Sequence, residues 1–219
     1  MEELLKHFLE RTTPLGALAR FHRERQLRRK FLQWERNGAV GPMPNYGKQQ
    51  AVRSYAKRFS PPVFIETGTY KGKMVYALIP YVTEIYSIEL DPKHYGNARR
   101  RFAGYPNIHL FCGQSGEILP EILKGIREPC LFWLDAHWSG GSTAKGELET
   151  PIMQEIECIL AHPLSARHVV LIDDARCFTG QNDYPTLETL RKRILAAHPD
   201  WLFEVKDDII RTHCQGDGN

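Results

Sequence analysis

The stretch FIETGTYKGKMVYAL, residues 64–78, contains the pattern that decides the fold of this chain. A short apolar run leads into a turn with glycines at positions 68 and 72, and a helix-like segment follows. Glycine permits the tight turns and close backbone approach that a ligand loop between a strand and a helix requires. Tyr70 stands where a dinucleotide-binding loop usually has another glycine, and Glu66 begins the turn. The turn is therefore a candidate ligand loop, and the surrounding residues must identify the ligand.

Short apolar runs continue along the chain and alternate with helix-like stretches. The apolar runs are 63–67, 84–90, 108–112, 129–135 and 168–174, and the helix-like stretches are 72–80, 93–103, 116–125, 151–162 and 185–197. Strands that are apolar on both faces and separated by helices indicate a parallel sheet covered on both sides. The last two apolar runs, within 201–213, have so short a connection that they should pair antiparallel at the sheet edge. The sequence therefore predicts a doubly wound α/β fold with a mostly parallel seven-stranded sheet and an antiparallel edge hairpin.

Residues 1–60 are predicted to form an N-terminal helical arm, and residues 61–219 the main domain. Helices are expected at 2–36, broken at Pro14, and at 48–59. The first 60 residues hold 13 Lys and Arg against 5 Asp and Glu, whereas the rest of the chain holds 16 against 21. The basic stretch 20–36 is compatible with nucleic acid, with a membrane surface, or with packing on the domain or on a second copy in a homodimer. We expect this stretch to pack on the domain or on a second copy. The acidic main domain disfavours binding of nucleic acid without excluding it.

Composition and length limit the class of protein. The 219 residues are 42% hydrophobic and 25% charged, which is ordinary for a globular protein. No apolar run approaches the roughly 20 residues that a membrane span needs, and the N-terminus has acids where a secretory signal needs bases. The five cysteines are widely spaced without a C-x-x-C pair, so we expect mostly buried thiols and a cytoplasmic protein.

The acidic residues near strand ends indicate which ligand the turn binds. In an open α/β sheet, ligands bind beyond the carboxyl ends of the strands. Glu89 ends the second run, seventeen positions after Gly72, and an acid at about this distance suits the hydroxyls of a ribose. A negative Glu66 would repel the diphosphate of NAD but would favour the sulfonium and ammonium groups of S-adenosylmethionine. We therefore expect S-adenosylmethionine as the cofactor.

Together these segments resemble the class I S-adenosylmethionine-dependent methyltransferases, most closely the catechol O-methyltransferase type. The resemblance covers about residues 60–213 and rests on E-x-G-x-Y-x-G at 66–72, IELDP at 88–92, CGQSGEILPEI at 112–122, LDAHW at 134–138 and VVLIDDA at 169–175. It implies a Rossmann-like methyltransferase fold. The residues that it assigns to the methyl donor are Glu66, Gly68, Thr69, Tyr70, Gly72, Glu89, Leu90, Gly113, Gln114, Ser115 and Asp135.

The same resemblance suggests residues for the reaction centre. Asp135, Asp173 and Asp174 match by position the residues that bind a divalent metal in that family, where Mg²⁺ acidifies the acceptor. Acids at strand ends can equally cap helices or bind the donor's amino group, so metal binding stays open. Ser139 stands where the family has a basic lysine. His137 is then the nearest residue with a suitable pKa for a base, unless it only bonds a backbone carbonyl. We predict Asp135 and His137 as the catalytic residues.

The predicted function is methyl transfer to a small-molecule acceptor, with a hydroxyl oxygen as the methylated atom and metal assistance as an option. The loop 139–151 and Tyr184 are candidates to enclose the acceptor. An RNA- or protein-directed methyltransferase that docks through the basic arm is one alternative, although no N-P-P-Y-type segment follows the fourth strand. An NAD-binding oxidoreductase and a non-catalytic nucleoside-binding subunit are the others.

Overall fold

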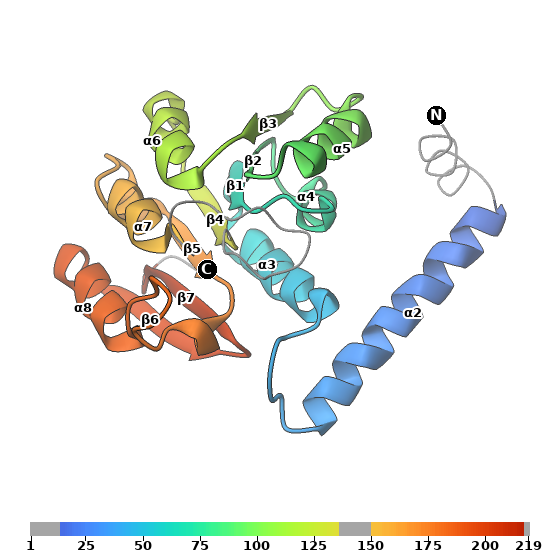
Figure 1. Ribbon diagram of the computed structural model, residues 1–219, viewed down its shortest axis with the longest axis horizontal. Helices are drawn as coiled ribbons and strands as arrows, with labels where there is room; N and C mark the ends of the chain where they lie inside the picture. The colour runs from blue at the N-terminus through green and yellow to red at the C-terminus, as the bar shows by residue number, and fades with distance from the viewer. Residues whose placement is uncertain (1–13, 136–149, 217–219) are drawn as a thin grey trace. The chain divides into compact units, whose positions relative to one another are not determined.

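The computed structural model of the protein describes residues 14–135 and 150–216. The chain forms two compact units, Met1–Ala51 and Val52–Asn219. In chain order the elements are α2 (Pro14–Arg36), α3 (Asn45–Phe59), β1 (Val63–Thr67), α4 (Lys73–Leu78), β2 (Glu84–Glu89), α5 (Pro92–Phe102), β3 (Ile108–Cys112), α6 (Ser115–Gly125), β4 (Cys130–Leu134), α7 (Ile152–Leu160), η1 (Ser165–Arg167), β5 (Val169–Ile172), η2 (Ala175–Cys177), α8 (Leu187–Ala197), β6 (Trp201–Lys206) and β7 (Ile209–Cys214) (Figure 1).

A seven-stranded sheet forms the centre of the second unit, in the order β3-β2-β1-β4-β5-β7-β6. Strands β1 to β5 pair parallel, whereas β7 pairs antiparallel with both β5 and β6. The predicted fold class is confirmed. From β1 the chain proceeds outward to β2 and β3, then returns to β4 on the other side of β1. This reversal between β1 and β4 is the point where open α/β sheets bind ligands, beyond the carboxyl ends of the strands.

Burial explains why the central strands form. Every residue of β1 and β4 is buried, as expected for strands in the middle of a sheet covered on both faces. On one face α6, α7 and α8 lie side by side (Figure 1) and contribute apolar residues at helical spacing to the core. Those residues are Leu119, Ile122, Leu123, Ile152, Ile156, Ile159, Leu190 and Ile194.

The edge hairpin turns through two aspartates. Asp207 and Asp208 have φ values of 55° and 61°, so both adopt the left-handed conformation of a two-residue type I′ turn. Aspartate tolerates this conformation better than most residues with a side chain. The turn fixes the register in which Lys206 pairs with Ile209 and Trp201 with Cys214.

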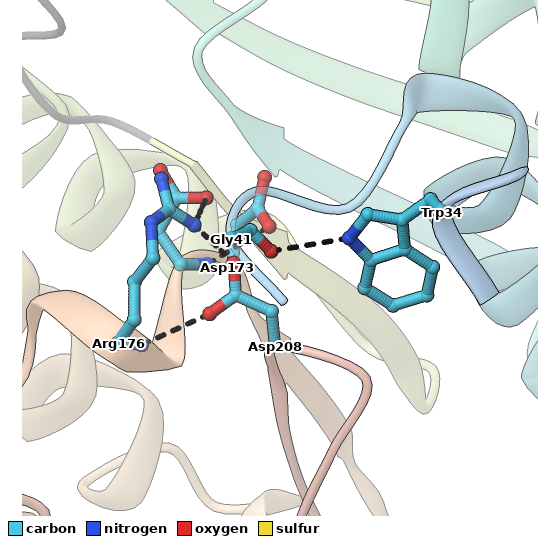
Figure 2. Close-up of polar contacts among 6 residues, drawn as sticks. Trp34, Gly41, Asp173, Arg176 and Asp208 are labelled. Atoms are coloured by element: carbon cyan, nitrogen blue, oxygen red, sulfur yellow. Dashed lines mark hydrogen bonds and ion pairs between the residues drawn. The ribbon is translucent and has the colours of Figure 1, made fainter. Parts of the chain in front are cut away.

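The first unit is held by aromatic side chains. The Trp34 Nε1–H donates to the Gly41 carbonyl at 3.3 Å (Figure 2), and the rings of Phe31 and Trp34 stack with centroids 5.8 Å apart. A Cβ on Gly47 would lie 2.4 Å from the Phe31 ring, so only glycine fits at the start of α3. That helix begins at Asn45, three residues before the predicted start. The Pro44 carbonyl accepts from the N–H groups of Gly47 and Lys48 and so forms the first turn.

Two expectations from composition concern membrane spans and cysteine burial. None of the described helices is long and apolar enough to cross a membrane. The expectation that most cysteines are buried is wrong: of the five, all within the described ranges, Cys130 alone is buried, and Cys112 is exposed. Cys112 ends β3, the outermost strand on its side of the sheet, where less apolar surface is covered.

Candidate active site

The turn after β1 has the backbone conformation that its glycines predict. Gly68 and Gly72 have φ values of 91° and 62°, and Tyr70 between them has a φ of 46°. A Cβ at position 72 would lie 2.6 Å from a ring carbon of Phe102, so a side chain is excluded there by both space and conformation. The N–H of Gly68 donates to the Ile88 carbonyl at 2.9 Å, which fixes the turn to the end of β2.

Glu89, at the end of β2, is bonded to this turn. Its Oε2 accepts from the Tyr70 N–H at 2.6 Å and its Oε1 from the Asp91 N–H at 2.9 Å, and the residue is only 7% exposed. Asp91 in turn caps α5 by accepting from the N–H groups of Lys93 and His94. Each carboxylate oxygen keeps a further lone pair, so Glu89 can still accept from ligand hydroxyls. The loop and the carboxylate are therefore one preorganised unit.

Glu66 lies on β1 inside a buried polar chain. The Ser87 hydroxyl donates to Glu66 Oε1 at 2.7 Å, and the Thr69 hydroxyl hydrogen-bonds to that of Ser87. Burial raises the pKa of Glu66 to about 8; the Ser87 hydrogen bond opposes this, and the charges of Asp135 and Glu89 add to it. Without a ligand the Glu66 carboxyl is therefore mostly protonated at neutral pH. The negative charge that the sequence argument assumed requires a nearby cation to stabilise it.

The segment after β3 lies beside Glu89. The Gly113 N–H donates to the Glu89 carbonyl at 2.9 Å, and a Cβ on Gly113, whose φ is 147°, would lie 2.8 Å from Ile118 Cδ1. Gln114 is the N-cap residue of α6 but makes no side-chain cap bond. Ser115 is 4% exposed, and among the described residues its hydroxyl has no hydrogen-bond partner. A buried hydroxyl of this kind is normally satisfied, so a ligand polar atom would fit here.

Three carboxylates meet at the ends of β4 and β5. One oxygen from each of Asp135, Asp173 and Asp174 lies within 4.8 Å of the other two. The Asp135 N–H donates to the Thr67 carbonyl at 3.0 Å, and the Asp174 N–H donates to Asp173 Oδ1 at 2.8 Å. Asp173 and Asp174 are buried, whereas Asp135 is half-buried. Oxygen ligands at this spacing suit a hard divalent cation such as Mg²⁺. The residues present therefore fit the metal that the family resemblance implies.

Two further groups belong to this cluster: Arg176, which was not among the predicted site residues, and Tyr184, which was predicted to help enclose the acceptor. The Arg176 Nη1 donates to Asp174 Oδ1 at 2.8 Å and also to Asp208 Oδ2, a contact drawn in Figure 2. Tyr184 lies near the carboxylates as well: burial raises the pKa of its phenol, and the charges of Cys177, Asp174 and Asp135 act in the same direction. The sequence indicates that Arg176 lies close to the Asp173–Asp174 pair, because it follows Asp174 by two positions. It does not indicate the contact between Arg176 and Asp208.

The structure brings most of the predicted site residues to one edge of the sheet. Glu89 links two of the segments predicted to bind the methyl donor, the turn after β1 and the segment that leads into α6. The three residues predicted to bind a metal form one cluster. Tyr70 contributes its backbone N–H to the Glu89 contact, and its side chain is 43% exposed. Leu90, the residue after Glu89, is half-buried. His137 and most of the loop 139–151 lie outside the described residues, so the predicted base stays a prediction.

Comparison with known proteins identifies this fold. No family model matches the chain, and no curated protein does. Among solved structures, the methyltransferase PaMTH1 of Podospora anserina with bound SAH has a TM-score of 0.56 at 20% identity, covering 83% of this chain and 86% of its own. The O-methyltransferase TomG of Streptomyces achromogenes with SAM has a TM-score of 0.58 at 15% identity, covering 87% and 89%. An O-methyltransferase from Bacillus cereus with bound SAH has a TM-score of 0.53 at 15% identity, covering 84% of this chain and 89% of its own. The chain thus has the fold of solved methyltransferases, as predicted.

Proposed function

We propose that this protein transfers a methyl group from S-adenosylmethionine to a small-molecule acceptor, with a hydroxyl oxygen as the methylated atom. The observation that carries the proposal is the Glu89 carboxylate, which the backbone N–H groups of Tyr70 and Asp91 hold beside a left-handed glycine turn. A fixed carboxylate at the end of β2, next to the turn after β1, suits the two hydroxyls of a ribose. The Ser115 hydroxyl, which has no hydrogen-bond partner within residues 14–135 and 150–216, suits the base of the same nucleoside.

Glu66 favours the methyl donor over NAD as the nucleoside ligand. Its carboxyl is buried near two further acids, Glu89 and Asp135, so a diphosphate placed here would meet like charge or protonated acid. A sulfonium or ammonium group would instead stabilise ionised Glu66. Binding of S-adenosylmethionine should therefore lower the pKa of Glu66 and release a proton at neutral pH.

The acceptor site is assigned to the three-carboxylate cluster of Asp135, Asp173 and Asp174. If a divalent cation binds there, it would act as a Lewis acid that lowers the pKa of the acceptor hydroxyl. The side chains would hold that cation through oxygen atoms that already lie within 4.8 Å of one another. We assign to Tyr184, whose phenol is half-buried near Asp174 and Asp135, the role of a hydrogen-bond donor to the acceptor. His137 remains the proposed base.

A second acceptor class has one observation in its favour. Helix α2 exposes the bases Arg25, Arg28, Arg29 and Lys30. An exposed basic helix is suited to an anionic macromolecule such as RNA. Filter binding of RNA at graded salt concentrations tests this alternative: affinity that falls steeply with salt and is lost when these four bases are changed together would favour RNA as the acceptor.

Transfer of label from S-adenosyl-[methyl-³H]methionine to a panel of phenols and catechols, and separately to RNA, tests the proposed activity. The wild-type protein should label a small hydroxyl acceptor, and Glu89→Gln should reduce this labelling at least about tenfold because it removes a ribose contact of the charge-assisted kind. Glu84→Gln is the matched control, since Glu84 begins the same strand and pairs with His109 instead. Donor binding without any transfer across the panel would contradict catalysis and would favour a nucleoside-binding subunit.

A further inference from the structure

The turn between β6 and β7 is attached to the segment that follows β5. The Asp208 Oδ1 accepts from the backbone N–H of Arg176 at 3.0 Å, and the Asp208 carbonyl accepts from the N–H of Ala175 at 2.9 Å. The Arg176 guanidinium adds a third contact, from Nη1 to Asp208 Oδ2 (Figure 2). The edge hairpin therefore contacts η2 through both the backbone and the side chain of one aspartate.

The same guanidinium nitrogen also reaches the three-carboxylate cluster. Arg176 Nη1 carries two hydrogens, and it donates to Asp174 Oδ1 at 2.8 Å as well as to Asp208. The side chains of Asp174 and Asp208 are 6% and 8% exposed, whereas that of Arg176 is 37% exposed. A guanidinium stays protonated in proteins, so Arg176 is a permanent cation between two buried carboxylates.

The backbone of Asp174 is left-handed, with a φ of 55° and a ψ of 47°. Aspartate tolerates this conformation better than most residues, but it still has an energetic cost that contacts with the surroundings must offset. The Asp174 N–H is bonded to Asp173 Oδ1, which also fixes the two aspartates relative to each other. The direction of the Asp174 carboxylate then depends on its side-chain contacts, among which is the one from Arg176.

We propose that Arg176 is a positioning residue which, together with Asp208, forms a clamp that orients the Asp174 carboxylate toward Asp135 and Asp173 for cation binding. This inference rests on the cation site of the proposed function. The clamp makes the β6–β7 turn a part of the site, although the turn itself contributes no carboxylate to the cluster. Partners of this kind, which hydrogen-bond to a metal-binding side chain, typically change metal affinity 10- to 100-fold when they are removed.

If Arg176 and Asp208 acted only through their charges, substitutions at the two positions would change the cation affinity in opposite directions. Arg176→Gln removes a positive charge near the cluster, so electrostatics alone would tighten cation binding. Asp208→Asn removes a negative charge, so electrostatics alone would weaken it. The clamp predicts that both substitutions weaken binding, because each releases the Asp174 carboxylate from its fixed direction. The two variants change the net charge in opposite directions and therefore separate the two roles.

Mn²⁺ binding to the full-length protein without a methyl donor, measured by the electron paramagnetic resonance signal of free Mn²⁺, is the test. The clamp predicts that Arg176→Gln and Asp208→Asn each raise the Kd about 10- to 100-fold. Arg193→Gln is the matched control, because Arg193 also pairs with a carboxylate, that of Glu157, away from the cluster. Arg176→Lys, which keeps the charge and one donor group, should recover part of the affinity.

For each variant, folding and binding of the methyl donor are measured separately from Mn²⁺ binding. The Tm of each variant and its affinity for S-adenosylmethionine by calorimetry should stay near those of the wild-type protein. If Arg176→Gln fails to fold, the comparison of Arg176→Lys with the wild type carries the test, and an unchanged Kd would overturn the clamp. Tighter Mn²⁺ binding by Arg176→Gln would also overturn it. A wild-type protein that binds no Mn²⁺ would overturn the clamp while calorimetry still decides whether donor binding stands.

Discussion

Replacing Glu66 by glutamine should remove a pH-dependent loss of stability from the wild-type protein. The Glu66 carboxyl is 1% exposed and has a pKa raised from 4.5 to about 8, chiefly by burial. Between these two values the unfolded chain has lost the proton while the folded chain keeps it. The free energy of unfolding therefore falls as the pH rises through this window, by about 1.4 kcal/mol per pH unit. The stabilisation is fully present below the unfolded pKa and is lost as the pH approaches 8.

The magnitude follows from the width of this window. From pH 5 to pH 7 the wild-type protein should lose of the order of 2 to 3 kcal/mol relative to Glu66→Gln, which cannot ionise at this position. Urea unfolding at pH 5, 6, 7 and 8 measures the difference directly. Glutamine can still accept the hydrogen bond from the Ser87 hydroxyl, so the buried polar chain keeps its acceptor.

Glu128→Gln is the control for this measurement, since Glu128 is exposed. Its stability curve should run parallel to that of the wild type. If the curves of the wild type and Glu66→Gln also run parallel between pH 5 and pH 8, burial does not hold the Glu66 carboxyl in its protonated form. The argument for proton release on donor binding would then be wrong as well.

Three further predictions follow from the site. Calorimetry in phosphate and in Tris at pH 7 should give different apparent enthalpies for S-adenosylmethionine, because binding ionises Glu66; identical enthalpies per mole would contradict this coupling. Gly72→Ala should destabilise the protein by about 1 to 3 kcal/mol in urea unfolding, because its Cβ would lie 2.6 Å from the Phe102 ring at a φ of 62°; an unchanged midpoint would refute the close approach. Chelation by EDTA should reduce methyl transfer and added Mg²⁺ should restore it, with Asp135→Asn refractory to the added metal; full activity in EDTA would remove the metal from the mechanism.

The fold could be predicted from the sequence because its central strands are apolar throughout. The runs at 63–67 and 108–112 coincide with β1 and β3, and the other predicted strands differ from the observed ones by one or two residues at the ends. Asp135, the last residue of the predicted fourth strand, is half-buried and lies just beyond β4, although its N–H still donates to the carbonyl of Thr67 at the end of β1. The apolar pattern therefore does not mark the residue at which a strand ends. The edge hairpin was predictable because only three residues, Lys206, Asp207 and Asp208, separate its apolar runs.

The parts of the site that the sequence did not predict depend on contacts between distant residues. Arg176 and Asp208 are 32 positions apart, and nothing in either local pattern indicates that η2 and the β6–β7 turn meet. The protonation of Glu66 likewise depends on burial by neighbouring strands, whereas its sequence position indicates only that an acid lies at the turn. The proximity of Glu89 to the turn was predictable from strand order alone, because β1 and β2 are adjacent parallel strands.

Calorimetric titration of the full-length protein at pH 7 with S-adenosylhomocysteine and, separately, with NAD tests the central assignment most directly. We predict saturable binding of the adenosyl ligand, at least about tenfold weaker in Glu89→Gln than in Glu84→Gln, and no heat of binding with NAD. Binding of NAD in preference to S-adenosylhomocysteine would contradict the account, as would an affinity for S-adenosylhomocysteine that does not change when Glu89 loses its charge.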